Sequence, residues 1–205
     1  MKKTTLFLLA LLGLVVSSSV GAAPSPSVTI AASRPIVVYG QSVTLSGTVS
    51  SHKAGETVRL ASEPLGKSAF SDFATATTTT RGAWNAVAKP TIQTMYRASW
   101  MTTTSQDVTV KVRPLVQLKL ISAAHGSFSV SVTGDRPFTG QYVLVQRFTS
   151  TGVTVLQHVT LDTSSSATFT VRLHRGLSRL RAVFPTSQAA PGYITGTSNV
   201  VTVRR

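Results

Sequence analysis

The residues of this sequence best suited to chemistry are arginines that gather in the segment VRLHRGLSRLR, residues 171–181. They are Arg172, Arg175, Arg179 and Arg181. A guanidinium presents a planar fork of N–H donors that fits a phosphate or a carboxylate, so a group of them is suited to binding an anionic polymer. Arg175, Arg179 and Arg181 are therefore candidate ligand contacts. The alternative is that a basic surface only keeps the protein soluble and protects its edge strands from pairing.

The charge of the whole chain leads to the same two alternatives. The formal net charge is +14, from 20 basic and 6 acidic residues. Residues 114–205 are the more basic half, with nine basic and two acidic residues, a net of +7. If the charge marks a site, we expect the site to centre on the connection between two strands, where the chain itself holds Arg175 and Arg179 close together.

The residues that usually perform catalysis or bind metals are too scattered here to form a recognisable site. The chain has no cysteine, no Gly-x-Ser-x-Gly motif, four single histidines and only six carboxylates. Metal binding needs several converging donors, and calcium loops need an alternating acidic run. The sequence therefore predicts no enzyme, no bound metal and no cofactor, and the histidines are expected to be solvated: His52, His125, His158 and His174.

Two tryptophans could serve either as a sugar-binding platform or as part of a core. Alternation places Trp84 on the same side of its strand as two alanines, and it places Trp100 on the same side as Tyr96. The equivalent positions later in the chain hold Phe169 and Phe184. Large apolar residues that recur in this way favour a buried position, so we expect both tryptophans in the core.

Short alternating segments, which run through the whole chain, predict an all-β protein. Val, Thr and Ser alternate in blocks such as SVTLSGTV, DVTVKV, SFSVSV and ATFTVRL, with Gly, Pro, Asn and Asp between them at intervals near ten residues. This spacing is typical of a β-sandwich or a barrel. With no disulfide possible, each domain must be held together by its apolar core.

The sequence repeats itself once. At an offset of 85 residues SVTLSGTV aligns with SFSVSVTG, YRASW aligns with LRAVF one residue earlier, and SQDVTVKV aligns with the final SNVVTVRR at an offset of 93. Self-similarity of this kind indicates one structural unit written twice. The boundary is expected at Arg113 and Pro114, where proline ends the pairing of the first copy's last strand.

In these segments the chain resembles the tandem immunoglobulin-like repeats of secreted bacterial proteins, particularly those of actinobacteria. The resemblance rests on VVYGQSVTLSGTV, AGETVRL, RGAW and KPTIQTMYRASW in the first copy, and on GQYVLVQR, RGLSRLRAVFP and APGYITGTSNVVTV in the second. It implies two Greek-key β-sandwich domains that serve as a spacer or a binding module. It implies no activity, because function does not follow from this fold.

The second copy has a longer connection before its last strand. The segment PTSQAAPGYITGT stands where the first copy has little more than MTTT. Loops at the ends of such sandwiches often carry binding residues. Tyr193, between two glycines, is therefore either an exposed ligand contact or a side chain that packs into the domain.

The first residues are typical of a secretory signal peptide. Two lysines precede an apolar run of roughly ten residues, too short for a membrane span, and small residues follow with a cleavage position after Ala22 and a neighbouring alternative at Ala23. We therefore expect a signal peptide over residues 1–22 and immunoglobulin-like domains over residues 23–113 and 114–205. Because the chain ends on a strand-like segment, we expect no C-terminal anchoring tail.

These observations predict a non-catalytic, extracellular structural or interaction module of two immunoglobulin-like domains, secreted or held at the cell surface. The alternative is a protein that binds an anionic or carbohydrate polymer of the envelope or the extracellular matrix. Candidate partners are an anionic cell-surface polymer, a carbohydrate or another surface protein.

Overall fold

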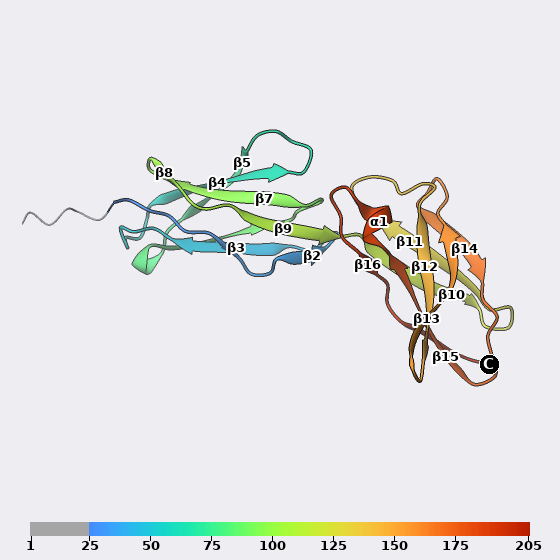
Figure 1. The fold of residues 1–205 in the computed structure, drawn as a ribbon. Coiled ribbons are helices and arrows are strands. Elements are labelled where there is room, and N and C mark those ends of the chain that lie inside the picture. The colour runs from blue at the N-terminus through green and yellow to red at the C-terminus, as the bar shows by residue number, and fades with distance from the viewer. Residues whose placement is uncertain (1–24) are drawn as a thin grey trace, which may run out of the picture.

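A computed structural model describes residues 25–205, so the expected signal peptide lies outside the described residues. Residues 25–113, here called the first unit, form two sheets (Figure 1). One sheet has the order β1-β3-β6, with bounds Ala31–Ala32, Val43–Thr48 and Ala83–Ala88. The other has the order β2-β9-β7-β4-β5, with bounds Ile36–Val38, Val108–Arg113, Thr94–Trp100, Thr57–Pro64 and Ser71–Thr77. The short β8 (Thr103–Thr104) pairs with β7, and a 3-10 turn covers Thr80–Gly82.

Residues 114–205, the second unit, repeat this arrangement except for β2, which pairs in parallel with β9 and has no counterpart there. Three strands, β10-β11-β14, form one sheet, with bounds Leu115–Ser122, Ser127–Thr133 and Ser166–Thr170. The other sheet has the order β13-β12-β15-β16, with bounds Gly152–Thr160, Tyr142–Thr149, Leu177–Phe184 and Gly196–Thr197. β17 (Val201–Arg204) also pairs with β15, and a one-turn helix, α1 (Thr186–Ala189), follows β15. The predicted all-β fold is confirmed.

The repeated phrase at the end of each copy forms the strand that pairs with the preceding long strand. β9 pairs with β7, and β17 pairs with β15, both antiparallel. The serine before each strand makes the same contacts: Ser105 exchanges hydrogen bonds with the backbone of Ala98, and Ser198 does so with Ala182. Both hydroxyls also donate to the carbonyl of the next residue. The sequence likeness therefore reflects one buried local structure that is formed twice.

The two tryptophans and their equivalents in the second unit lie inside the sandwiches, and burial of the tryptophans was predicted from alternation. Trp84 and Trp100 are 2% and 5% exposed, and the equivalent Phe169 and Phe184 are 9% and 0% exposed. Burial of such side chains contributes about 1.5–3 kcal/mol each, and no residue pair in either unit can form a disulfide. The apolar cores therefore carry the stability of both units.

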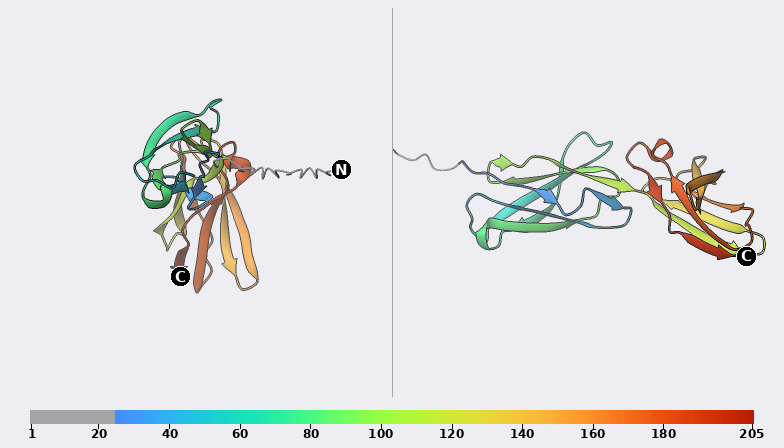
Figure 2. Two further views of the ribbon diagram at one scale, coloured as in Figure 1. Left: turned by 90° about the vertical axis from the view of Figure 1, so that its left-hand side faces the viewer. Right: turned by 60° about the horizontal axis from the view of Figure 1, so that its bottom comes forward.

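The two units lie end to end. β9 ends at Arg113 and β10 begins at Leu115, so only Pro114 separates the last strand of one unit from the first strand of the next. The turned views show an elongated molecule (Figure 2). Within residues 25–205, no strand of one unit pairs with a strand of the other. The second unit thus has one end against the first unit, here called the junction, and an opposite end, here called the far end.

Candidate functional site

Tyr193 lies at the junction, where its hydroxyl group joins the two units. The hydroxyl donates to the carbonyl of Thr91 in the first unit at 2.7 Å and accepts from the backbone N–H of Asp135 in the second unit at 2.6 Å. The side chain of Thr91 in turn donates to the carboxylate of Asp135 at 3.2 Å. One phenol thus connects three segments that are far apart in the sequence.

The backbone on both sides of Tyr193 also contacts the first unit. The carbonyl of Gly192 accepts from the N–H of Gln93 at 2.9 Å, and the N–H of Ile194 donates to the carbonyl of Val112 at 3.0 Å. Gly192 has a φ of +92°, and a Cβ there would collide with the side chain of Ile92. Glycine is therefore required at this position both by its conformation and by the close approach of the first unit.

A partly buried arginine, Arg136, supports the junction from the second unit. One terminal nitrogen of Arg136 donates to the carbonyls of Ala189 and Ala190 at 2.9 and 3.1 Å. Its guanidinium also lies over the ring of Phe138, which in turn packs edge-on against Tyr193. These contacts fix the end of α1 and hold the Tyr193 segment in place.

Tyr193 therefore does not face solvent as a ligand contact. It is 3% exposed, and burial raises the pKa of its phenol above the ordinary value. Of the two roles that the sequence left open, the structure shows the packed one. The reason is that the extra residues of this connection meet the end of the first unit instead of projecting into solvent.

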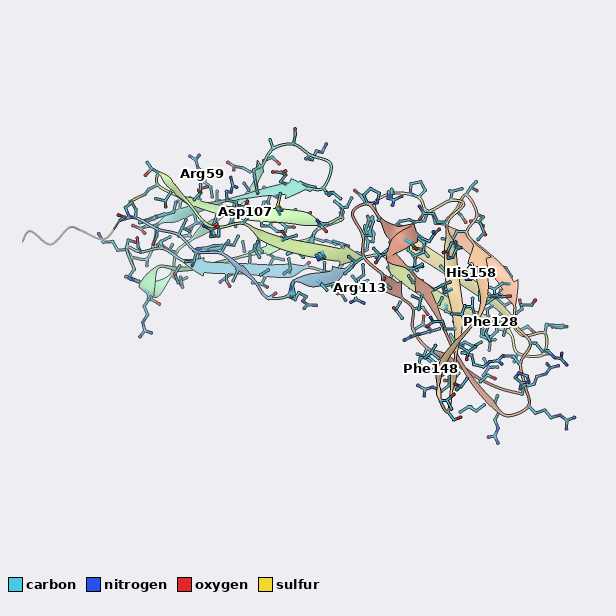
Figure 3. All side chains as sticks on the ribbon, viewed as in Figure 1. Arg59, Asp107, Arg113, Phe128, Phe148 and His158 are labelled. Carbon is cyan, nitrogen blue, oxygen red and sulfur yellow. The ribbon has the colours of Figure 1, made fainter. Side chains whose placement is uncertain are left out.

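The candidate arginines fall into two groups at the other end of the second unit. Arg179 and Arg181, on β15, each place a guanidinium 5.1 Å from the centre of the Phe148 ring, and Arg181 also donates to the side chain of Gln146 at 2.8 Å. Phe148 lies on the part of the second unit that points away from the junction (Figure 3). The guanidinium groups of Arg179 and Arg181 thus lie over the same Phe148 ring and partly cover it.

Arg175 belongs to a different surface. It follows β14 and lines an open hollow of about 600 Å³ together with Arg172, Leu173, His174 and Arg205. Gly176 and Arg205 exchange backbone hydrogen bonds here, which brings the last residue of the chain to this connection. The sequence predicted that Arg175 and Arg179 mark one site, whereas the structure groups Arg179 with Arg181 and Arg175 with Arg172.

A further arginine, which the sequence analysis did not single out, adjoins this hollow. Arg147 lines a neighbouring hollow of about 230 Å³ that also contains Arg172 and His174. It follows Val143 and Val145 on the inward side of β12, both of which are fully buried. The alternation of β12 therefore places Arg147 on the same side as these two valines, where it is partly buried at the edge of the core. A charged residue is unusual in such a position, and this was the signal in the sequence that could have identified it.

Residues 25–205 contain no group of three or more His, Cys, Asp or Glu side chains that could hold a metal ion. His158 stacks on the ring of Tyr142 with their centroids 4.7 Å apart. In the same range, no helix is long and apolar enough to cross a membrane.

Comparisons with known proteins yield a fold resemblance only. No protein-family model and no curated protein matches the chain. Among solved structures, one described as a tetra-tandem repeat in the extending region of a large adhesion protein is similar, with 14% identity and a TM-score of 0.39. The similarity covers 87% of this chain and 49% of that one, so the chain spans about half the length of the structure it matches.

Proposed function

We propose that this protein is an exported, non-catalytic structural module in which two immunoglobulin-like domains, residues 23–113 and 114–205, act as one rigid spacer at or outside the cell surface. Export rests on the N-terminal residues 1–22, and the domain boundary rests on the repeat and on Pro114. The spacer role goes beyond the fold, and it depends on how firmly the two units are joined.

The observation that carries the proposal is the double hydrogen bond of the buried Tyr193 hydroxyl. A linker of one residue still permits rotation about its backbone, and domains joined by small polar contacts usually move. Here Tyr193 bonds to Thr91 and Asp135, and two backbone hydrogen bonds flank it. Buried polar groups that are satisfied only in one arrangement favour that arrangement over all others.

The distance between the two units in solution tests this proposal. Since the chain has no cysteine, spin labels can be attached at two introduced cysteines, Thr75→Cys on β5 and Thr154→Cys on β13, both exposed positions. Pulsed electron–electron double resonance should show one narrow distance distribution in the otherwise unchanged protein. A broad distribution would contradict the rigid spacer.

A pair of variants assigns the rigidity to the junction. Tyr193→Ala should broaden the distribution, because it removes both hydroxyl bonds and the packing against Phe138. Phe148→Ala removes an aromatic ring from the second unit away from the junction and should leave the distribution narrow. Equal broadening in both variants would show that the Tyr193 contacts do not hold the units together.

A further inference from the structure

We infer that the far end of the second unit is a binding site for an acidic polysaccharide, formed by Arg147, Arg172, His174, Arg175 and Arg205. The two hollows described above meet at Arg172 and His174, which line both. Together they form a continuous open surface between the edges of the two sheets and the end of the unit. This inference is independent of the junction and of the spacer role.

The first observation is the incomplete pairing of Arg147. One terminal nitrogen donates to the carbonyl of Arg172 at 2.7 Å, while the Nε atom is buried and has no hydrogen-bond partner within the described residues. Among the described residues the structure records one ion pair, between Arg97 and Asp107. No carboxylate in this range therefore lies within 4 Å of the Arg147 guanidinium. A half-buried charge without a counter-ion is unfavourable, and an anion bound beside it would remove that cost.

The second observation is the separation of charge within the second unit. Its two acidic residues, Asp135 and Asp162, both lie toward the junction: Asp135 contacts Tyr193, and the residues after Asp162 line the same hollow as Asp135. Asp162 already accepts hydrogen bonds from Ser164 and Ser166. The far end therefore has basic side chains and no acidic side chain to neutralise them, which gives a positive field over this surface.

The strand register places the basic residues together. Leu115 pairs with Thr133 at the junction end of the β10–β11 pair, whereas Ser127 pairs with Thr170 at the opposite end. The chain leaves β14 there, and residues 171–176 cross to β15, whose first residue, Leu177, pairs with Arg204. Arg172, His174, Arg175 and Arg205 are thus held at one end by the sheets themselves.

The shape and side chains of the surface indicate the class of ligand. One guanidinium group can donate two parallel hydrogen bonds to two oxygens of a carboxylate or sulfate. Several guanidinium groups spread over an open hollow therefore suit a polymer with repeated anionic groups better than one small anion. Single-stranded nucleic acid is usually bound on exposed aromatic rings. Neither hollow is lined by a Phe, Tyr or Trp side chain on which bases could stack, whereas the anionic groups of an acidic polysaccharide need only the guanidinium groups that are present.

Binding can be tested with dextran sulfate and neutral dextran, which share one sugar backbone. We expect the protein to bind dextran sulfate and not dextran in isothermal titration at physiological salt, with an affinity that falls as salt rises. The double variant Arg172→Ser/Arg175→Ser should weaken binding about tenfold and reduce the slope of log affinity against log salt by about two. A matched variant, Arg34→Ser/Arg59→Ser, removes the same charge from exposed positions of the first unit and should weaken binding less than about twofold.

A second pair of variants tests the role of Arg147. Arg147→Met should melt at or above the temperature of the unchanged protein, because it removes a partly buried charge that has no counter-ion, and it should bind dextran sulfate more weakly. Arg136 also has a buried, unpaired Nε, but its terminal nitrogen is held by two carbonyls at the junction. Arg136→Met should therefore lower the melting temperature and leave binding unchanged.

Three results would overturn the inference. Equal losses from the two double variants would show that the charge acts only as a diffuse coat. Tighter binding of single-stranded DNA than of dextran sulfate would assign the surface to nucleic acid. A large loss of stability in Arg147→Met with unchanged binding would make Arg147 a structural residue.

Discussion

The β6–β7 connection of the first unit and the equivalent β14–β15 connection of the second unit differ in what they contact: the first packs against the other unit, and the second is open to solvent. In the first unit, residues 89–93 join β6 to β7, and Thr91, Ile92 and Gln93 contact the second unit. In the second unit, residues 171–176 join β14 to β15 and line an open basic hollow. One end of a β-sandwich can thus be a buried contact or a free surface, and the side chains of its loops decide which.

The connection before the last strand differs in the opposite way: it lies away from the other unit in the first unit and contacts the other unit in the second. In the first unit it is short, contains β8 and lies away from the junction (Figure 1). In the second unit the extra residues form α1 and the Tyr193 segment, and they contact the first unit. The corresponding loop of single immunoglobulin-like domains often carries binding residues, whereas here it joins the two units.

The largest effect is expected where the two units are most alike, in their cores. Trp84→Ala removes a side chain that is 2% exposed and should lower the free energy of unfolding by about 3–5 kcal/mol. Chemical denaturation followed by circular dichroism measures this. Unchanged stability combined with lost sugar binding would place Trp84 in a binding surface instead.

A smaller effect on stability is expected at alkaline pH, and it comes from Tyr96 of the first unit, whose pKa is strongly raised. Burial raises the pKa of Tyr96 to about 12. The folded protein holds this proton more tightly than the unfolded chain does. The contribution of Tyr96 to the free energy of unfolding is therefore fully present below a pH of about 10 and is lost as the pH rises toward about 12. Stability measured across this range should fall less steeply in Tyr96→Phe, and an identical fall in both proteins would contradict the assignment.

The junction should show a smaller change than the cores. Tyr193→Phe keeps the ring and removes the hydroxyl, so that the carbonyl of Thr91 and the N–H of Asp135 lose their partner, at a cost of about 1–3 kcal/mol. Tyr142→Phe is the control, because the hydroxyl of Tyr142 has no hydrogen bond within residues 25–205. Equal melting temperatures for the two variants would mean that the hydroxyl bonds at the junction contribute little.

The smallest effect is expected from removal of metal ions. Neither unit contains a cluster of metal-binding side chains within the described residues, so a chelator should leave the melting temperature unchanged. Differential scanning calorimetry with and without EDTA measures this. A large decrease would reveal a metal that supports one of the units.

The sequence by itself determined the architecture of this protein. Alternation predicted the strands, and the equivalence of Trp84 with Phe169 and of Trp100 with Phe184 predicted that both tryptophans are buried. The repeated Ser105 and Ser198 marked the same local structure in both copies. These features were readable because alternation is a local property: each residue's side of the strand follows from that of its neighbours.

Only the tertiary structure decided where the candidate site residues lie. Tyr193 is buried because the end of another unit meets it, and no local pattern contains that contact. Arg175 and Arg179 are four residues apart, yet Arg179 shares Phe148 with Arg181 while Arg175 shares a hollow with Arg172 and Arg205. Arg147 joins that surface from a distant strand. The conformation of a loop depends on what it packs against, and the neighbours of a side chain at the end of a sandwich come from segments that only the folded chain brings together.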